Sequence, residues 1–507
     1  MIKNRAKILF PDMAAILLGM LLTLAFAPYE FFPLAILVPA GLLMLWLNTS
    51  PQRAFWLGFL FGLGFFGAGV YWVFISIHVI GEVPLLLAGI ITAVFIAILS
   101  VFPASVGYCL NRYFPSLHTA KIVFAFPAIW VLSEWLRSFI FTGFPWLFLG
   151  YSQTNSPLKG IAPWLGIYGV SLAVLISSAL IVNAMLAYKE KIYLHCYKNL
   201  FALCFIWLLS HLSTFIPWTQ AEGKAIPVAL VQGDIPQAIK WSPEHIKLSF
   251  DRYVSLTKPL WGKNKLIIWP EAAIPMPLQN ARDFIDEMDE QAIKSGSQLI
   301  LGIPIEANAN SYYNAIIALG NDKKVYLKRR LVPFGEYTPF SQFFARAFNF
   351  MDIPMSDMVP GKPIQEPFVI GKIKILPAIC YEISFPDLMR TNDETIGFLL
   401  TLSNDAWFGE SNAEAQHFQM AAMRALEFGR PVLFVSNDGI TGVIQPDGKM
   451  AAEAPSHVPF VLTTTVQPVY GLTPWMRNGS DPVLFILICF IGAAVRFNKK
   501  VNLARAC

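Results

Sequence analysis

The chain has 507 residues, of which 55% are hydrophobic and only 14% charged, and its mean hydropathy is +0.52. Soluble domains carry about 25% charged residues, so this composition predicts a membrane protein, with length for two or three domains. The net charge of +5 is too small to indicate a nucleic-acid partner, and we expect none.

Long apolar segments fill most of residues 8–216 and return once near the C-terminus. A transmembrane helix needs about 20 mostly apolar residues, and eight segments are predicted to span. They lie near 12–28, 32–48, 54–78, 84–110, 121–141, 163–187, 199–216 and 481–496. The chain is therefore predicted to hold a bundle of seven helices at 1–216, a polar domain at 217–480, and an eighth helix with a tail at 481–507.

The Lys and Arg residues of the short connections gather on one side of the predicted spans, at every second connection. They are Lys3, Arg5, Lys7, Arg53, Arg112, Lys121, Lys189, Lys191, Lys198, Arg496, Lys499, Lys500 and Arg505. Because cytoplasmic loops collect Lys and Arg, both termini are predicted to be cytoplasmic, in a bacterial inner membrane, with the polar domain in the periplasm. Residues 2–27 also resemble a signal peptide, but the next apolar span follows within a few residues, which favours a retained first helix.

Two charged residues interrupt the fifth predicted span. Glu134 and Arg137 are three residues apart, so they share a helix face and could pair. Ionisable groups at membrane depth are costly and often functional. A structural ion pair and a contact to a lipid headgroup both remain open. The stretch at 142–164 is rich in Gly, Pro and aromatic residues, which indicates an interfacial or re-entrant loop.

The polar domain alternates strand-like and helical patterns. Apolar, β-branched runs lie at 225–233, 265–271, 297–304, 313–320, 372–382, 397–405, 431–438 and 459–466. Helical patterns lie at 281–294 and 412–429, and the turn signal at 445–449 predicts a hairpin. This alternation predicts an α/β sheet with helical layers, in which chemistry gathers at the carboxyl ends of strands. Polar residues follow strands at 269–271, 378–382 and 403–405.

One of the six cysteines stands apart from the others. Cys109, Cys204 and Cys489 lie in or beside predicted spans, Cys196 and Cys507 lie on the predicted cytoplasmic side, and only Cys380 lies in the polar domain. A lone cysteine in an oxidising compartment is either a buried filler or a working thiol. Cys380 ends a strand and precedes polar Tyr381 and Glu382, which favours a working thiol.

A thiol must lose its proton to attack, and the sequence offers two kinds of base. A histidine could pair with Cys380, but the domain's candidates, His245, His417 and His457, sit in no recognisable motif. Alternatively, Glu271, at the end of a strand, could take the proton. Lys328, in the polar segment 326–340, could then stabilise the thiolate and an oxyanion, aided by a backbone N–H after the cysteine. Each charge taken singly could instead be an ordinary surface residue.

The order Glu271, Lys328, Cys380 resembles the Glu-Lys-Cys triad of the nitrilase, or carbon–nitrogen hydrolase, superfamily. The segments that carry the resemblance are 269–275, 331–339, 379–388, 403–409 and 416–431, with 144–153 in the membrane part. With the eight-helix frame, the chain is similar to the membrane-bound branch, the apolipoprotein N-acyltransferase family. The resemblance implies an α/β nitrilase-like αββα sandwich for the polar domain, beside the membrane α-helical bundle.

The resemblance also implies a reaction and roles for residues. Cys380 would accept the sn-1 acyl chain of a phosphatidylethanolamine-type phospholipid as a thioester and pass it to the N-terminal amine of diacylglyceryl-cysteine on an apolipoprotein. It implies that Glu271 is the base, that Lys328 stabilises the oxyanion, and that Glu336 is the additional glutamate beside the lysine. Tyr381 and Glu382 would shape the site, and Trp241 would line the substrate cleft. We expect a monomer and no cofactor. We also expect no metal site, since neither CxxC nor HExxH occurs.

Three other interpretations use the same residues. A membrane-tethered nitrilase-like amidase would use the triad with water as the acceptor, and would have little need for seven preceding helices. A transporter with a sensing domain would need several buried charges in the bundle, whereas only Glu134 and Arg137 appear, so we discount it. A domain that only binds its ligand is disfavoured, though not excluded, by an intact triad.

Overall fold

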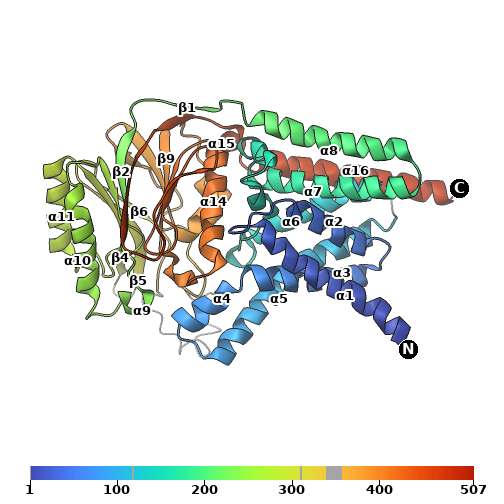
Figure 1. Ribbon diagram of the computed structural model, residues 1–507, viewed down its shortest axis with the longest axis horizontal. Coiled ribbons are helices and arrows are strands. Elements are labelled where there is room, and N and C mark those ends of the chain that lie inside the picture. Colours follow the sequence, from blue (N-terminus) through green and yellow to red (C-terminus); the bar gives the residue numbers. More distant parts are fainter. Residues whose placement is uncertain (1, 117–118, 309–310, 338–356, 507) are drawn as a thin grey trace. The chain divides into compact units, whose positions relative to one another are not determined.

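A computed structural model describes residues 2–116, 119–308, 311–337 and 357–506. The last two residues of the 331–339 motif and Cys507 lie outside the described residues, as do the side chains of 2–8 and 499–506 with their Lys and Arg groups. The chain divides into two compact units (Figure 1). The helical unit comprises Met1–Phe74, Leu85–Ile216 and Pro474–Cys507, and the α/β unit comprises Ile75–Pro84 and Pro217–Thr473.

The helical unit is built from nine α-helices in the described residues. They are α1 (Ile2–Leu22), α2 (Leu34–Trp46), α3 (Pro51–Gly69), α5 (Leu85–Tyr113), α6 (Phe126–Arg137), α7 (Ala162–Lys189), α8 (Tyr193–Ser213), α15 (Pro474–Asn478) and α16 (Asp481–Ala506). Glycines let three of them approach closely. A Cβ on Gly62 of α3 would lie 2.6 Å from Ser100 Cα of α5, and one on Gly64 would lie 2.2 Å from Ile16 O of α1. Small residues at helix contacts are typical of packing inside membranes.

Every predicted span contains a helix, but the predicted number of eight spanning helices is not confirmed. Among the described residues, Leu85–Tyr113, Pro157–Lys189 and Asp481–Asn498 are long and apolar enough to cross a membrane. A fourth span results if Pro51–Gly69 and Trp72–Ile80, bent by 55° at their break, count as one. The helix α2 has 13 residues and α6 has 12, short of the roughly 20 that a full crossing needs.

The segment Ile75–Pro84, half of which we predicted to lie in spans, is grouped with the α/β unit. After α4 (Trp72–Ile75) the chain forms a π-helical turn, Ser76–Ile80, instead of continuing an α-helix. Ser76 Oγ donates a hydrogen bond to Trp407 O of the α/β unit at 2.6 Å. The polar Ser76 and His78, which interrupt the apolar run, mark where the sequence leaves the spanning pattern.

The α/β unit contains two six-stranded sheets. One has the order β13-β2-β3-β4-β5-β6, with β13 (Phe460–Val466), β2 (Ile226–Gln232), β3 (Leu266–Ile268), β4 (Gln298–Asn308), β5 (Ser311–Leu319) and β6 (Lys324–Leu327). The other has the order β12-β11-β10-β9-β8-β7, with β12 (Met450–Glu453), β11 (Gly442–Ile444), β10 (Val432–Ser436), β9 (Ile396–Ser403), β8 (Ile373–Ile379) and β7 (Phe368–Ile370). A separate pair joins β1 (Thr219–Ala221) to β14 (Val469–Gly471). The eight predicted strand runs all form strands, and the predicted turn at 445–449 joins β11 to β12.

The two sheets pack face to face, and helices cover their outer faces (Figure 1). In β2, Val228 and Leu230 enter the core between the sheets, whereas Ala229 and Val231 enter the core beneath α10 (Ile246–Thr257) and α11 (Arg282–Ser295). Both faces of the strand are therefore buried, which explains its continuous apolar run.

A third helix completes the sandwich on the outer face of the other sheet. On α14 (Asn412–Phe428), Phe418 packs against Phe434 of β10, with ring centroids 5.4 Å apart. The layers are thus helix, sheet, sheet, helix, and the predicted αββα sandwich is confirmed. Two short helices, α9 (Gln237–Lys240) and α13 (Pro386–Met389), lie in the connections after β2 and β8.

Candidate active site

Cys380 begins a tight turn at the carboxyl end of a buried strand. It follows β8 directly and is the first residue of a 3₁₀ turn, Cys380–Ser384. Its φ of +49° lies in the left-handed region, which costs a non-glycine residue about 1–3 kcal/mol and persists only where the surroundings fix it. Strain of this kind is typical of functional positions, and it gives the partly buried thiol a fixed direction at the strand end.

Glu271 lies on a turn that presses against a neighbouring strand. It follows β3 by three residues and is 7% exposed. A Cβ on Gly302 of β4 would lie 2.7 Å from Glu271 Cα and 2.6 Å from Ala272 N. The glycine in β4 therefore allows the Glu271 turn to approach the sheet, and a larger residue there would displace the carboxylate.

Lys328, one residue beyond β6, is buried between two carboxylates. Its Nζ lies 3.2 Å from Glu271 Oε1 and 2.8 Å from Glu336 Oε1, and the side chain is 1% exposed. Asn314 Nδ2 of β5 donates to the same two oxygens at 2.7 and 2.8 Å. A buried charge is tolerated when it is paired and hydrogen-bonded, and Lys328 meets both conditions.

The charges around Cys380 determine its state before the reaction. Burial lowers the pKa of Lys328, but Glu271 and Glu336 raise it more, so this pKa lies above its ordinary value and the ammonium stays charged. Burial raises the pKa of Cys380 well above its ordinary value, the charge of Glu271 raises it further, and Lys328 opposes them. Cys380 therefore rests as a neutral thiol, and a role as nucleophile would require a base to take its proton.

Glu382 joins the Lys328 loop to the Cys380 turn. Its Oε1 accepts from Arg329 N and Arg330 N at 2.7 and 3.2 Å, and its Oε2 accepts from Tyr326 Oη and Ile379 N, both at 2.8 Å. The side chain is fully buried. Burial raises the pKa of Glu382, while Arg329 and these hydrogen bonds oppose the rise. One carboxylate thus links the loop that carries Lys328 to the turn that carries Cys380.

Tyr381 and Trp241 are chain neighbours of residues in the site, Cys380 and Lys240. The Tyr381 ring packs edge-on against Phe385, with centroids 4.9 Å apart. Trp241 is partly buried and directly follows α9. Lys240, the last residue of α9, donates a hydrogen bond from Nζ to Glu271 O at 3.3 Å. Burial lowers the pKa of Lys240 to about 8, and the charge of Glu271 opposes the fall. Sequence reasoning missed Lys240, because a single lysine beside a tryptophan carries no signal.

The histidine alternative finds no support in the described contacts. His417 Nε2 lies 3.1 Å from the backbone O of Cys380, His245 contacts Ser242, and His457 contacts Asp438. Sequence reasoning missed Asn314 and gave Asp405 no role, although the motif at 403–409 contained Asp405. Among the described residues, no group of three or more His, Cys, Asp or Glu is placed to hold a metal ion.

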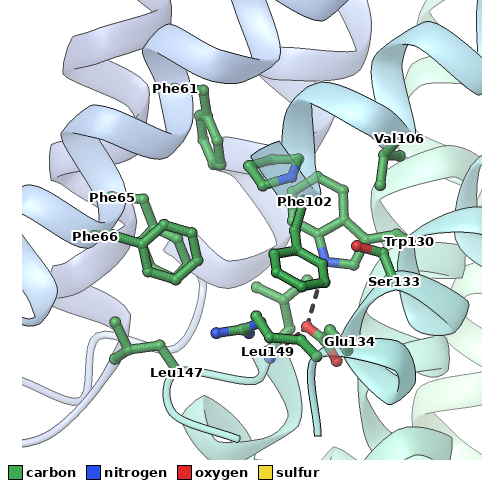
Figure 2. A pocket seen from close by; sticks show the side chains of 12 residues that line it. Phe61, Phe65, Phe66, Phe102, Val106, Trp130, Ser133, Glu134, Leu147 and Leu149 are labelled. Carbon is green, nitrogen blue, oxygen red and sulfur yellow. Dashed lines mark hydrogen bonds between the residues drawn. The ribbon is translucent and has the colours of Figure 1, made fainter. Parts of the chain in front are cut away.

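In the helical unit, Glu134 and Arg137 hold the loop that follows them. Glu134 Oε1 accepts from Leu149 N at 3.0 Å and from Trp130 Nε1 at 3.3 Å (Figure 2). Arg137 Nη1 donates to Trp146 O at 2.7 Å, and its guanidinium lies over the Phe148 ring, 4.8 Å from the centroid. Both charges thus act on residues 146–149, which makes them structural partners of the aromatic loop.

Comparison with known proteins agrees with both units. Residues 18–180 match the family model of the apolipoprotein N-acyltransferase N-terminal domain, and residues 227–472 match that of carbon-nitrogen hydrolases. An apolipoprotein N-acyltransferase of Coxiella burnetii is 43% identical over 481 residues, which cover 94% of this chain and 98% of that protein. The chain belongs to the apolipoprotein N-acyltransferase family. It is therefore an acyltransferase, and the predicted resemblance is confirmed.

A second relative is similar over nearly the same share of both chains. The apolipoprotein N-acyltransferase of Methylococcus capsulatus is 38% identical, covering 94% of this chain and 94% of that protein. A solved carbon–nitrogen hydrolase superfamily protein from Xanthomonas campestris is 19% identical, with a TM-score of 0.37, and covers 48% of this chain and 91% of that chain. We base the fold assignment on the family model and the observed sheets. Family membership also favours acyl transfer over the amidase interpretation.

The contacts of Glu382 lead to a first testable prediction. In Glu382→Gln, either amide orientation sets an NH₂ group against backbone or hydroxyl donors, because both carboxylate oxygens accept bonds from such donors. We expect acyl transfer to fall at least tenfold and unfolding to become easier by about 1–3 kcal/mol. Enzyme assays and thermal unfolding would measure the two effects. Glu366→Gln is the matched control, since the Glu366 side chain is 82% exposed. Equal effects in both variants would contradict the role of Glu382 in linking the two segments.

The charges at Cys380 lead to a second prediction, in which two readouts move in opposite directions. Glu271→Gln removes a charge that raises the thiol pKa, so the thiolate fraction at a fixed pH rises and alkylation of Cys380 by iodoacetamide becomes faster. Acyl transfer should fall about 10²–10⁴-fold, the loss expected when a general base is removed, if Glu271 has the role expected from the sequence. In the unaltered chain, alkylation should keep rising with pH beyond the range of an ordinary thiol. Mass spectrometry of the Cys380 peptide gives the rates, and slower alkylation in Glu271→Gln would contradict the account.

Proposed function

We propose that the chain transfers an acyl chain from a phospholipid, through a thioester on Cys380, to the N-terminal amine of diacylglyceryl-cysteine on apolipoproteins. Family membership supports the overall reaction. The observation that supports the residue roles is the buried ammonium of Lys328, held between Glu271 and Glu336 beside the strained turn of Cys380. A phosphatidylethanolamine-type donor and its sn-1 position are part of the proposal.

In the first half-reaction, the Cys380 sulfur attacks the ester carbonyl of the phospholipid while Glu271 takes the thiol proton. The tetrahedral oxyanion is stabilised by Lys328 Nζ and by the backbone N–H that follows Cys380. When the intermediate collapses, the C–O bond breaks, and the leaving alkoxide takes the proton from Glu271. The products are the thioester and a lysophospholipid, so the proton count balances and Glu271 is again ionised.

In the second half-reaction, the neutral α-amine of the diacylated cysteine attacks the thioester. Glu271 takes one N–H proton, and collapse breaks the C–S bond. The departing sulfur recovers that proton, which regenerates the thiol and leaves an amide. An amine that arrives as an ammonium ion must first lose a proton to the solvent. The reaction is ping-pong through a covalent intermediate, and Glu271 serves as acid and base in both halves.

The architecture suits substrates that stay in a bilayer. The α/β unit is joined along the chain to α8 before it and α16 after it, so the catalytic residues cannot diffuse away from the membrane. This tethering supplies proximity that a soluble thiol enzyme would lack. We propose that Glu336 keeps Lys328 charged, that Tyr381 and Glu382 shape the site, and that Trp241 lines the substrate cleft. Because one chain supplies all these residues, a monomer is sufficient for activity.

We further propose eight membrane-embedded helices in a bacterial inner membrane, arranged as a bundle at 1–216, a catalytic domain at 217–480 and a final helix with a tail at 481–507. The alternation of Lys and Arg among the connections supports cytoplasmic termini and a periplasmic catalytic domain. Water near the thioester would hydrolyse it, so the site must exclude water once it is acylated.

Acyl transfer can be tested directly with defined lipids. Purified enzyme in phosphatidylethanolamine vesicles, given a synthetic diacylated lipopeptide, should yield N-acylated peptide and one lysophospholipid per peptide, both quantified by mass spectrometry. Cys380→Ser should reduce the yield by a factor of at least 10³, because a hydroxyl is a far poorer nucleophile than a thiol at neutral pH. Cys204→Ser, which alters an exposed thiol of α8, is the matched control. Free fatty acid without N-acylated peptide would instead favour an amidase-like hydrolase.

The proposed orientation has its own test. In a chain that carries Cys380→Ala, the exposed Ile364, which is 90% accessible, is changed to Cys. A membrane-impermeant maleimide should label Cys at position 364 in intact spheroplasts, and should label Cys507 only after lysis. Labelling of both positions only after lysis would contradict the periplasmic placement.

A further inference from the structure

The backbone carbonyl of the nucleophile has a buried side-chain partner. His417 Nε2, on α14, lies 3.1 Å from Cys380 O. A carbonyl oxygen only accepts hydrogen bonds, so Nε2 must carry the proton and donate. The imidazole is fully buried, and its ring contacts Phe408 and Phe434 edge-on, with centroids 5.9 and 5.2 Å apart. This donor is therefore held in one orientation.

A second acceptor holds the other nitrogen of the same ring. Asp405 Oδ1 lies 3.0 Å from His417 Nδ1, and Asp405 is also fully buried. Ser403 Oγ donates to Asp405 Oδ1 at 2.7 Å, and Asp405 N donates to Ser436 Oγ at 3.2 Å. Because Cys380 O requires the proton on Nε2, a second proton must lie between Nδ1 and the carboxylate, where two bare acceptors would otherwise face each other. The chain from Ser403 through Asp405 and His417 ends on the nucleophile's own peptide group.

The peptide group between Cys380 and Tyr381 carries one acceptor and one donor. The carbonyl of Cys380 and the N–H of Tyr381 belong to one planar trans peptide, so they point in opposite directions. A donor on the carbonyl therefore fixes the direction of the N–H on the opposite side. It also polarises the N–H, because hydrogen bonds in series strengthen one another by roughly 10–30%. This N–H is the backbone donor that the proposed reaction uses for the oxyanion.

We propose that His417 and Asp405 are positioning residues that orient and polarise the oxyanion-binding peptide of Cys380. The inference rests on the proposed acyl transfer and assigns His417 a role other than that of a base for the thiol. Lys328, just after β6, supplies one donor to the oxyanion, and the His417–Asp405 pair orients the other, the N–H of Tyr381. The left-handed φ of Cys380 needs such an anchor, because a strained turn keeps its geometry only when its surroundings fix it.

Alkylation separates this role from a general structural one. Displacement of iodide from iodoacetamide by the Cys380 thiolate forms no oxyanion, whereas acyl transfer does. In full-length enzyme, His417→Leu should lower kcat for acyl transfer about 10- to 100-fold, with unchanged KM for phospholipid and an unchanged alkylation rate at Cys380. His417→Gln keeps an N–H donor at a similar reach, and it should recover part of the lost kcat.

Asp405→Asn gives a second, independent readout if His417→Leu fails to fold. Asp405 raises the pKa of Cys380, so its neutral replacement should make alkylation equal or faster while kcat for acyl transfer falls. A purely structural role predicts that both rates fall together. Unchanged kcat in all three variants, or a parallel loss of alkylation and transfer, would overturn the inference.

The unaltered enzyme, assayed in parallel, separates this inference from the function on which it rests. Absence of acyl transfer in that enzyme would overturn both the proposed function and the role of His417. Normal transfer in the unaltered enzyme together with insensitive variants would overturn only the role of His417 and Asp405.

Discussion

The site depends on one buried cation, the ammonium of Lys328, shared by Glu271 and Glu336. Taking an ammonium out of water is costly, and removing one partner of such a pair leaves an uncompensated charge. Two carboxylates and the amide of Asn314 remove that penalty here. The arrangement also gives Cys380 opposing neighbours, since Glu271 disfavours the thiolate and Lys328 favours it. The proposed nucleophile therefore stays protonated until the proposed base acts, which limits side reactions of a permanent thiolate.

The sandwich provides the geometry that this charge arrangement needs. Glu271, Lys328 and Cys380 follow β3, β6 and β8, which belong to two different sheets, and the core between the sheets holds those strands together. Glu382 then joins the loop after β6 to the turn after β8, so the segments that carry Lys328 and Cys380 are linked by one carboxylate. On the far side of that turn, His417 connects Cys380 to α14. The site is thus supported by both sheets and one covering helix.

Much of this could be predicted from sequence because burial leaves strong patterns. Strands such as β2 are apolar on both faces. Glu271 and Cys380 could be identified because polar residues follow the apolar strands β3 and β8. Asn314 could not be predicted, since it lies within an apolar strand and gains its role only when β5 meets the Glu271 turn. Lys328 was identified by its place in the polar segment 326–340, because the strand before it, β6, has only four residues and gives no clear pattern.

The helical unit was harder to predict in detail. Hydropathy located a helix in each predicted span, but α2 and α6 are shorter than a full crossing, and no pattern shows how short helices combine in a bilayer. Glu134 and Arg137 were placed correctly on one helix face, yet their hydrogen bonds go to the aromatic loop at 146–149, a tertiary contact that residue spacing cannot reveal.

The central claim is that Cys380 carries the acyl chain between two lipids. The most direct measurement is the mass of the enzyme after a brief incubation with phospholipid alone, followed by peptide mapping. The account predicts a mass increase of one acyl group on Cys380, removed by hydroxylamine as thioesters are, and discharged when diacylated lipopeptide is added. An acyl group on another residue, or transfer to lipopeptide at full rate with no acylated Cys380 at any time, would contradict the account.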